Sequence, residues 1–392
     1  MSAPVRPRLL VVFYANPDYY PPTFSAVSLL NEHFDVHVVC RKSDREMRLW
    51  PAGVRLDRRG PGQTQEEQQS ASRVQKLGEF AAFVLTVRKA LSRYRPSVVL
   101  AYEPHALAAL SLAGNRAPLV YQRHEVEERG QHDPRSLGGW IAKYALLKSR
   151  EASLVVFPEA QRAAYYASFA KLSHEPLIVP NFPLLRSFPR PDFDALLPER
   201  ARARSVLYRG AMGPANGIRE AVRTLTELDR TLSLRLFGPG NPKFLAEISQ
   251  QAIDQGVDDR LDLAGFVSLE ELNRQTQRAS VGLMLYQPVD TNWTFNASAN
   301  NKLYEYAACG VPALVPNRSA FRDFLAGEEW VELVDEQDPR SIADGVRRIL
   351  STPEAYEARS RLARRRFEER FNYEAVFGPM LTRIRELARS RA

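Results

Sequence analysis

Short apolar runs alternate with longer amphipathic segments along almost the whole chain, and this alternation limits the possible folds more than any other feature. Runs such as "LLVVFYA" (9–15) and "SVLYRGA" (205–211) are separated by segments with apolar residues at helical spacing. Strands linked by helices form parallel sheets that are covered on both faces. The sequence therefore predicts an α/β protein. The expected strands cover 9–15, 34–40, 97–102, 118–124, 153–158, 176–181, 205–211, 232–240, 261–267, 281–287, 312–317 and 330–335.

The length of the chain predicts more than one domain. Its 392 residues exceed the roughly 250–300 at which a single hydrophobic core stops growing. The alternation breaks over 176–203, where prolines are dense and no helix of useful length is expected. We therefore expect a first domain over 1–183, a proline-rich linker over 184–203, a second domain over 204–370 and a terminal helix over 371–392.

Composition narrows the class of protein. Hydrophobic residues make up 44% and charged residues 26%, which is typical of a folded soluble protein. Cys40 and Cys309 lie far apart and have no metal-ligand spacing, so we expect no zinc site or disulfide framework, and a reducing cytoplasm fits best. No run of about 18 apolar residues predicts a membrane-spanning helix. A cytoplasmic protein is therefore expected.

Two arginine clusters stand out, at 200–204 ("RARAR") and 363–370 ("ARRRFEER"). The preferred interpretation is a solvated helix or linker face, because acids interleave in the second cluster. Anionic lipid is the alternative partner, which would place the protein peripherally at the inner face of a membrane. Neither cluster has the interleaved aromatic residues of a nucleic-acid site, so no nucleic-acid partner is expected.

Open parallel sheets bind ligands at the carboxyl ends of their strands, so we expect the chemistry in the loops that follow the strands. Two such loops, 210–217 and 238–240, are rich in glycine, and the backbone amides of a following helix favour an anion. A tight strand-to-helix turn would explain either loop equally well. In the segment "SANNKLYEYAACG", Lys302 and Glu305 lie in a short helix, where Glu305 either caps the backbone or holds a ligand.

Taken together, "LYRGAMGPANGIREAV", "LRLFGPG", "LDLAGFVSLEEL" and "SANNKLYEYAACGVPALV" resemble, in order and spacing, the carboxy-terminal domain of family 4 glycosyltransferases of the GT-B fold. The resemblance covers about half of the chain. The first half is similar only in its strand and helix order and in the histidine loop "QRHEVEE". The segment around 371–377 resembles the one that crosses back onto the first domain. The resemblance implies two Rossmann-like domains, one for the acceptor and one for the nucleotide sugar, whose parallel sheets face an interdomain cleft.

The resemblance also implies roles for individual residues. It makes Glu305 the residue that holds the donor ribose, and it places the amides of 300–303 at the diphosphate. Phe266 and Val267 would receive the base, Gly210 would approach the phosphates, and His124 would face the transferred sugar. The expected donor site contains Gly210, Ala211, Met212, Asn216, Gly238, Pro239, Phe266, Val267, Tyr286, Asn300, Asn301, Lys302, Leu303 and Glu305.

This sequence departs from the family pattern at two places. An acid that the family usually carries upstream of Glu305 falls on Ala297, and its basic pair in the first glycine loop falls on Ala211 and Asn216. Neither of these two can neutralise a diphosphate, so Lys302 and the nearby Arg209 are the expected substitutes. The expected catalytic residues are His124, Lys302, Glu305 and Arg209.

The acceptor is expected at the first domain. The loop "YANPDYYPPTFSA" offers aromatic rings and polar groups for a sugar or cyclic acceptor, although a rigid turn with exposed tyrosines is the alternative. Asp18 and Tyr19 also belong to this loop. For His124, a hydrogen-bonded loop residue without a binding role is the alternative interpretation. The expected acceptor-binding residues are Tyr14, Asn16, Tyr20, Glu103 and Glu125.

The resulting expectation is a metal-independent glycosyltransferase that transfers a sugar from a nucleotide-sugar donor to a hydroxyl acceptor, and the resemblance to family 4 implies that it is a retaining enzyme. Helix amino ends and cations can stabilise a departing nucleoside diphosphate without a metal, and no Asp-x-Asp pair occurs in a suitable loop. No cofactor is expected besides the nucleotide-sugar co-substrate. Assembly of polysaccharide or lipid-linked glycan is the expected setting. The alternatives are a glycosyltransferase that decorates a small secondary metabolite and a catalytically inactive GT-B partner subunit that binds a nucleotide or glycan.

Overall fold

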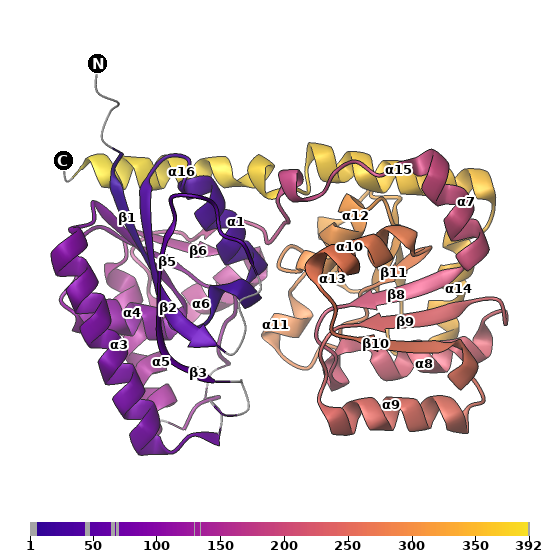
Figure 1. The fold of residues 1–392 in the computed structure, drawn as a ribbon, viewed down its shortest axis with the longest axis horizontal. Helices are drawn as coiled ribbons and strands as arrows, with labels where there is room; N and C mark the ends of the chain where they lie inside the picture. Colours follow the sequence, from indigo (N-terminus) through magenta and orange to yellow (C-terminus); the bar gives the residue numbers. More distant parts are fainter. Residues whose placement is uncertain are drawn as a thin grey trace. The chain divides into compact units, whose positions relative to one another are not determined.

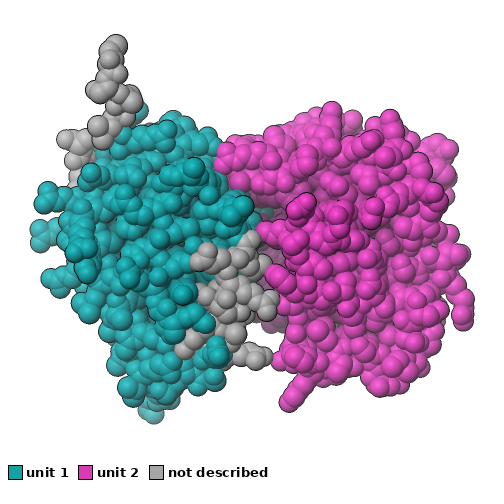
Figure 2. Space-filling view, in the orientation of Figure 1, with its two compact units in different colours: residues 1–181, 376–392 teal, residues 182–375 magenta. Residues whose placement is uncertain are grey.

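The computed structural model describes residues 6–43, 48–63, 67, 70–128, 130–133 and 135–390. The chain divides into two compact units (Figure 2), one formed by 1–181 with 376–392 and the other by 182–375. Both units are α/β, with helices packed around a parallel sheet (Figure 1). This confirms the predicted fold class.

The first unit is built on a seven-stranded parallel sheet in the order β3-β2-β1-β4-β5-β6-β7. Its strands are β1 Arg8–Phe13, β2 Asp35–Ser43, β3 Arg55–Gln63, β4 Val98–Tyr102, β5 Leu119–Gln122, β6 Leu154–Phe157 and β7 Leu177–Ile178. Its helices are α1 Pro21–Leu30, α3 Arg73–Tyr94, α4 Glu103–Leu112, α5 Leu137–Lys148 and α6 Ala160–Ala170. The strands β4, β5 and β6 are buried throughout, as expected for strands covered on both faces.

The second unit has a six-stranded parallel sheet in the order β10-β9-β8-β11-β12-β13. Its strands are β8 Ser205–Arg209, β9 Ser233–Phe237, β10 Leu261–Gly265, β11 Val281–Leu283, β12 Ala313–Pro316 and β13 Val331–Val334. Its helices are α7 Phe193–Ala203, α8 Ile218–Glu227, α9 Pro242–Asp254, α10 Leu269–Arg278, α11 Thr291–Thr294, α12 Asn301–Ala308, α13 Ser319–Phe324, α14 Pro339–Ile349 and α15 Pro353–Glu369.

The last helix, α16 Tyr373–Arg389, begins in the second unit and continues into the first. The final two residues of the helix predicted over 371–392 lie outside the described residues. None of the described helices is both long enough and apolar enough to span a bilayer.

Each sheet has a point where the direction of strand addition reverses. In the first unit this point lies between β1 and β4, and in the second it lies between β8 and β11. This is the doubly wound order of Rossmann-like folds, which bind ligands in the crevice outside the carboxyl ends of the strands at the reversal. The loops after these four strands are therefore where the candidate site residues are expected.

Two expectations from the sequence were wrong. The strand β3 was not predicted, because its segment carries charged residues where an apolar alternation would be expected. The proline-rich stretch was expected to contain no useful helix, yet α7 lies within it and includes Pro198. Asp192 caps this helix by accepting a hydrogen bond from the amide of Ala195 at 3.3 Å.

The arginine clusters are also not uniformly solvated. Arg200 is 1% exposed and Arg364 is 4% exposed. Arg200 donates to the carbonyls of Cys309 and Gly310 at 2.8 and 2.6 Å, and Arg364 donates to the carbonyl of Ala308 at 2.6 Å. These carbonyls lie at the carboxyl end of α12, where backbone acceptors lack helical partners and a cation is favourable. Both arginines therefore anchor the helix that carries Lys302 and Glu305.

Candidate active site

The expected site residues divide between the two units, and each group is described in its own unit. In the second unit, the loops after β8, β9 and β11 pack backbone against backbone. A Cβ atom added to Gly238 (φ 138°) would lie 2.1 Å from the carbonyl oxygen of Gly210, and one added to Gly217 (φ 71°) would lie 2.2 Å from that of Leu285. Only glycine avoids both the clash and the strained backbone at these two positions. The two glycine loops are therefore one packed structure.

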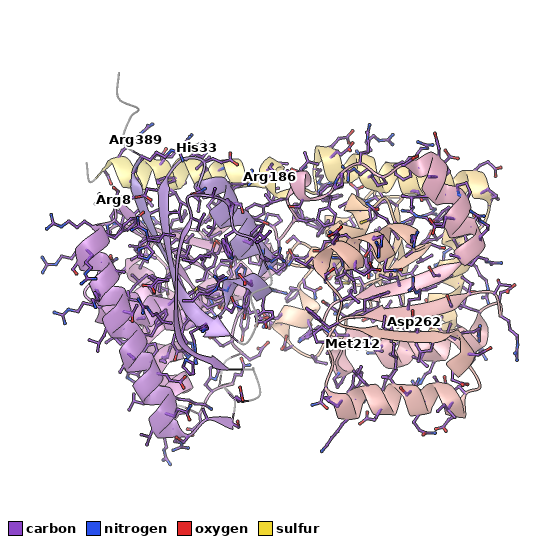
Figure 3. All side chains as sticks on the ribbon, in the orientation of Figure 1. Arg8, His33, Arg186, Met212, Asp262 and Arg389 are labelled. Atoms are coloured by element: carbon purple, nitrogen blue, oxygen red, sulfur yellow. The ribbon has the colours of Figure 1, made fainter. Side chains whose placement is uncertain are left out.

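Hydrogen bonds join the predicted donor residues of these loops. The amide of Met212, labelled in Figure 3, donates to the carbonyl of Pro239 at 2.7 Å. The amide of Gly238 donates to the carbonyl of Gly265 at 2.7 Å. Phe266 follows directly and is 48% exposed. The structure thus brings together the expected residues of all three loops at the carboxyl edge of the sheet.

Lys302 lies over the first glycine loop. Its Nζ atom donates to the hydroxyl of Tyr208 at 2.8 Å and lies 4.2 and 4.5 Å from the ring centroids of Tyr208 and Tyr286. A Cβ atom at Gly210 would lie 3.2 Å from the same Nζ, so the ammonium occupies the space that the missing side chain leaves. Aromatic faces attract a cation at these distances.

The environment of Lys302 lowers the pKa of its amine to about 7. Burial is the largest cause, because the side chain is only 9% exposed and water no longer stabilises the charge. The carboxylate of Glu305 opposes this shift and the guanidinium of Arg209 adds to it. An anion arriving beside Lys302 would favour the ammonium form.

Glu305 pairs with Arg209. The Nε atom of Arg209 lies 2.9 Å from Oε2 of Glu305, with the two side chains 3% and 15% exposed. The same guanidinium donates to Thr276 at 3.0 Å and to Asn273 at 3.2 Å. Arg209 is therefore held by α10 and by Glu305. The sequence had placed Arg209 at the diphosphate, and spacing along the chain gave no signal for Asn273, Thr276 or Tyr208.

The amino end of α12 is capped by the side chain of Asn300, the residue just before the helix. Oδ1 of Asn300 accepts a hydrogen bond from the amide of Leu303 at 3.2 Å. Of the three residues that depart from the family pattern, Ala297 and Asn216 are buried and Ala211 is exposed. The carbonyl of Ala211 accepts the hydroxyl of Tyr208 at 2.6 Å, which links this loop to the partner of Lys302.

In the first unit, Glu103 lies directly after β4 in an unusual conformation. Its φ of 66° is in the left-handed region, which is uncommon outside glycine and concentrates at functional sites. Oε1 accepts the amide of His124 at 2.6 Å, and Oε2 lies 3.7 Å from Nε of Arg123. Burial raises the pKa of Glu103 to about 7, although Arg123 and the amide of His124 oppose that shift.

His124 is enclosed by aromatic rings. It stacks on Tyr102 at 5.4 Å and on Tyr20 at 6.0 Å, and its Nε2 lies 3.1 Å from Oγ1 of Thr23. Its carbonyl accepts a hydrogen bond from Arg162 at 2.6 Å. Burial, aided by Arg162, lowers the pKa of His124 to about 3, so the ring is neutral at physiological pH.

The aromatic first loop is partly internal. Tyr14 stacks on His105 at 5.2 Å and packs edge-on against Phe80 and Phe83. Asn16 accepts the amide of Asp18 at 3.1 Å.

Asp18, expected among the polar groups for an acceptor, is instead 1% exposed. It accepts hydrogen bonds from Trp50 at 2.7 Å and from Arg58 at 3.0 Å, so it fixes the loop to the sheet. Tyr19 and Glu125 are exposed.

Among the described residues, no group of three or more His, Cys, Asp or Glu side chains is placed to hold a metal ion.

Comparison with known proteins agrees with this geometry. Residues 215–382 match the protein family described as glycosyl transferase-like. No curated protein matches the chain.

Several solved structures have the same fold. Sucrose-phosphate synthase from Thermosynechococcus elongatus superposes with a TM-score of 0.75 at 18% identity over 98% of this chain and 100% of that chain. HepE from Anabaena, solved with UDP and glucose, has a TM-score of 0.68 at 13% identity over 98% and 99%. WaaG, a glycosyltransferase involved in lipopolysaccharide biosynthesis, has a TM-score of 0.67 at 13% identity over 96% and 98%. The chain therefore has the GT-B fold of these structures, and residues 215–382 within it match the glycosyl transferase-like family.

Proposed function

We propose that this protein is a retaining, metal-independent glycosyltransferase of family 4 that moves a sugar from a nucleotide-sugar donor to a hydroxyl acceptor. The observation that carries the proposal is the position of Lys302, whose ammonium lies over Gly210 and between two tyrosine rings. A nucleotide sugar bound at the reversal point of the sheet would present its diphosphate to this cation. HepE, solved with UDP-glucose, has the same fold and supports this class of donor.

The chemistry of the leaving group follows from this position. Glycosyl transfer develops positive charge on the sugar and negative charge on the departing nucleoside diphosphate, so an enzyme gains rate by stabilising the second. The diphosphate would hold Lys302 in its ammonium form, while Tyr208 accepts one of its hydrogen bonds. The amino end of α12 adds a favourable dipole. Metal independence is proposed because a protein cation meets the developing charge.

Glu305 is proposed to accept hydrogen bonds from the ribose hydroxyls. Arg209, expected from the sequence at the diphosphate, is proposed instead to position Glu305, because its guanidinium already contacts Glu305, Asn273 and Thr276. Phe266 and Val267 are proposed to contact the base, since the loop that carries them joins the glycine loops. Retention of anomeric configuration, by front-face attack assisted by the leaving phosphate, rests on the resemblance to family 4.

The acceptor is proposed to bind at the carboxyl edge of the first unit. Glu103 has a pKa of about 7, so its carboxyl group can donate or accept a hydrogen bond to a sugar hydroxyl at physiological pH. Neutral His124 lies beside it, and Tyr14, Asn16, Tyr20 and Glu125 belong to the adjacent loops. The acceptor is proposed to be a polysaccharide or lipid-linked glycan. The cleft between the two groups stays a prediction, as does a cytoplasmic location.

A panel of nucleoside diphosphates, followed by the matching nucleotide sugars, tests the proposal. Uridine, guanosine, adenosine and thymidine diphosphates should each be screened by thermal unfolding, where a ligand at 100 times its Kd adds about 2.7 kcal/mol to the free energy of unfolding. Release of the best nucleotide from its sugar conjugate should then be followed with glycan and small-molecule acceptors. Turnover with glycans supports the proposal, and turnover only with a cyclic metabolite selects the alternative acceptor. Nucleotide binding without any release would make the protein a binding partner subunit.

Peripheral membrane contact is proposed through α3. Val74, Leu77 and Leu85 are 81%, 56% and 65% exposed and lie at helical spacing on one face, with Arg73 and Arg88 beside them. Co-sedimentation with phosphatidylglycerol vesicles should fall in the double variant Leu77→Glu/Leu85→Glu. The matched control Leu112→Glu/Ile253→Glu changes two exposed apolar residues elsewhere and should sediment like the wild type. Equal sedimentation of both variants would contradict this contact.

A further inference from the structure

An open cavity of about 470 Å³, lined mostly by charged residues, lies in the first unit. It is lined by the first residues of β1 and β2, by the first half of β3 and by the carboxyl half of α3, and its arginine and lysine side chains are exposed. Arg8, labelled in Figure 3, is the first residue of β1 and lies opposite Asp35 in the strand register. His37 lies opposite Arg55 in the register of β2 and β3. The cavity therefore begins at the amino edge of the sheet and extends along β3 to Arg59, which is in register with Arg41.

The opposite edge of the same sheet carries Tyr14 and Glu103, which follow β1 and β4. Six residues of β1 separate the two edges, which at about 3.3 Å per residue is roughly 17–20 Å. Ligands of open parallel sheets bind at the carboxyl edge. Arg8, His37 and Arg55 of the cavity thus lie at the edge opposite to the proposed acceptor residues, and the proposed function does not explain them.

The charge of the cavity wall is strongly unbalanced. Five cationic side chains line it: Arg8, Arg55, Arg59, Lys89 and Arg93. Two carboxylates, those of Asp35 and Asp57, oppose them, which leaves an excess of 5 − 2 = 3 positive charges. Asp57 is already paired with Arg59 at 2.5 Å. Within the described ranges, no carboxylate lies within ion-pair distance of Arg55, Lys89 or Arg93.

Protection of an edge strand is the competing explanation. β3 is the edge of the sheet, and charged residues on an edge prevent pairing with other chains. This accounts for Arg55 and Arg59 but not for Arg8 on the third strand inward or for Lys89 and Arg93 on the covering helix. The cations converge from three elements on one cavity.

His37 supplies an independent observation. The residue is 8% exposed, lines the cavity and has an Nδ1 atom without a hydrogen-bond partner among the described residues. Buried polar atoms are almost always paired, and one without a partner in a polar cavity points to a ligand or ordered solvent. The ring packs edge-on against Tyr94 at 5.2 Å, so an aromatic wall adjoins the cations.

We propose that this cavity binds a phosphorylated small molecule through Arg55, Arg93, Lys89 and His37. Arginine presents paired N–H donors that match phosphate oxygens, and lysine adds a point charge. The volume falls within the range of small-molecule sites, about 300–1,000 Å³. A soluble phosphate ester and a lipid phosphate share this chemistry.

Calorimetric titration with inorganic pyrophosphate tests the site. The full chain with Lys302→Met serves as background, because this change removes the cation of the donor site. In that background, Arg55→Gln/Arg93→Gln should weaken pyrophosphate binding at least tenfold. The control Arg116→Gln/Arg223→Gln removes the same charge from exposed positions outside the cavity and should bind like the background. If Arg55→Gln prevents folding, Lys89→Gln/Arg93→Gln changes only exposed helix positions and should give the same loss.

The outcomes separate the site from general charge. Equal binding in the cavity and control variants, or no binding in the Lys302→Met background, would overturn the proposal. Vesicles of phosphatidylcholine with 20% phosphatidic acid then distinguish the sources. If the vesicles compete with pyrophosphate for the protein, the natural ligand is a lipid phosphate. If the protein binds pyrophosphate and the vesicles do not compete, the natural ligand is a soluble phosphate. Failure of this proposal leaves the donor assignment untouched, because release of nucleotide from its sugar conjugate does not depend on these residues.

Discussion

Replacing Lys302 with methionine is expected to lower kcat/KM for the nucleotide-sugar donor about 100- to 1,000-fold, the range seen when one group that stabilises transition-state charge is removed. Methionine is similar in length and fills the slot between Tyr208 and Tyr286, but it offers no charge to the diphosphate. Steady-state release of nucleoside diphosphate measures the loss. Thermal unfolding should show no loss of stability, because an apolar side chain replaces a largely buried cation.

A matched variant separates this effect from a general loss of charge. Lys143 is exposed on α5 of the first unit, and Lys143→Met removes the same charge outside the donor loops. Its kcat/KM should equal that of the wild type. An active Lys302→Met variant would show that another group carries the charge of the leaving group.

The pH dependence of the wild type provides a further check on Lys302. With a pKa of about 7 in the free protein, the ammonium is lost as pH rises above 7, so kcat/KM should decline there. The effect on stability has the opposite sign. The unfolded amine titrates near 10.4, so between pH 7 and about 10 the unfolded chain binds more protons, and the contribution of this group to stability rises with pH. Lys302→Met should lack both dependences.

Much of the fold was predictable because burial on both faces leaves a simple signal. β4, β5 and β6 are short apolar runs, and each lies inside a predicted strand. The strand β3 was not predicted, because Arg55, Asp57 and Arg59 alternate along it and line a cavity rather than a hydrophobic core. Hydrophobic periodicity detects a strand only where its face meets apolar neighbours.

The helix α7 in the proline-rich stretch was not predicted for a related reason. Proline disfavours a helix interior, yet α7 forms around Pro198 because tertiary contacts outweigh local propensity. Arg200 within this helix is buried and donates to carbonyls at the end of α12, about 110 residues away in sequence. Its partners are set by the packing of two helices, which the spacing of residues along the chain does not encode.

The candidate site was predictable in its location but not in its contacts. The order of the glycine loops and of Lys302 and Glu305 identified the carboxyl edge of the second sheet. Lys302 and Arg209 were both expected to face a diphosphate, although only Lys302 lies over the glycine loop. Arg209 is turned toward Glu305 by Asn273 and Thr276, which lie 64 and 67 residues further along the chain.

The second large effect is expected at Glu305. Changing it to glutamine should raise the inhibition constant of the matching nucleoside diphosphate by about 10- to 100-fold, because hydrogen bonds to a charged group contribute about 1.5–3 kcal/mol. Glutamine keeps the shape of the side chain and an oxygen for Arg209, so the fold is retained. Alanine would leave the guanidinium of Arg209, 3% exposed, without its carboxylate, which destabilises a protein by about 3–5 kcal/mol.

Comparison of two inhibitors isolates the ribose. The inhibition constants of the nucleoside diphosphate and of inorganic pyrophosphate are both measured in competition with the nucleotide-sugar donor, so they report binding at the donor site alone. If Glu305 binds the ribose, Glu305→Gln weakens the nucleoside diphosphate and leaves inorganic pyrophosphate unchanged, whereas Lys302→Met weakens both. Equal weakening of both inhibitors by Glu305→Gln would mean that Glu305 acts on the phosphates through Arg209 and Lys302. Arg209→Met decides between the two roles, because a positioning arginine then reproduces the selective loss of the nucleoside diphosphate, and a phosphate-binding arginine weakens pyrophosphate as well.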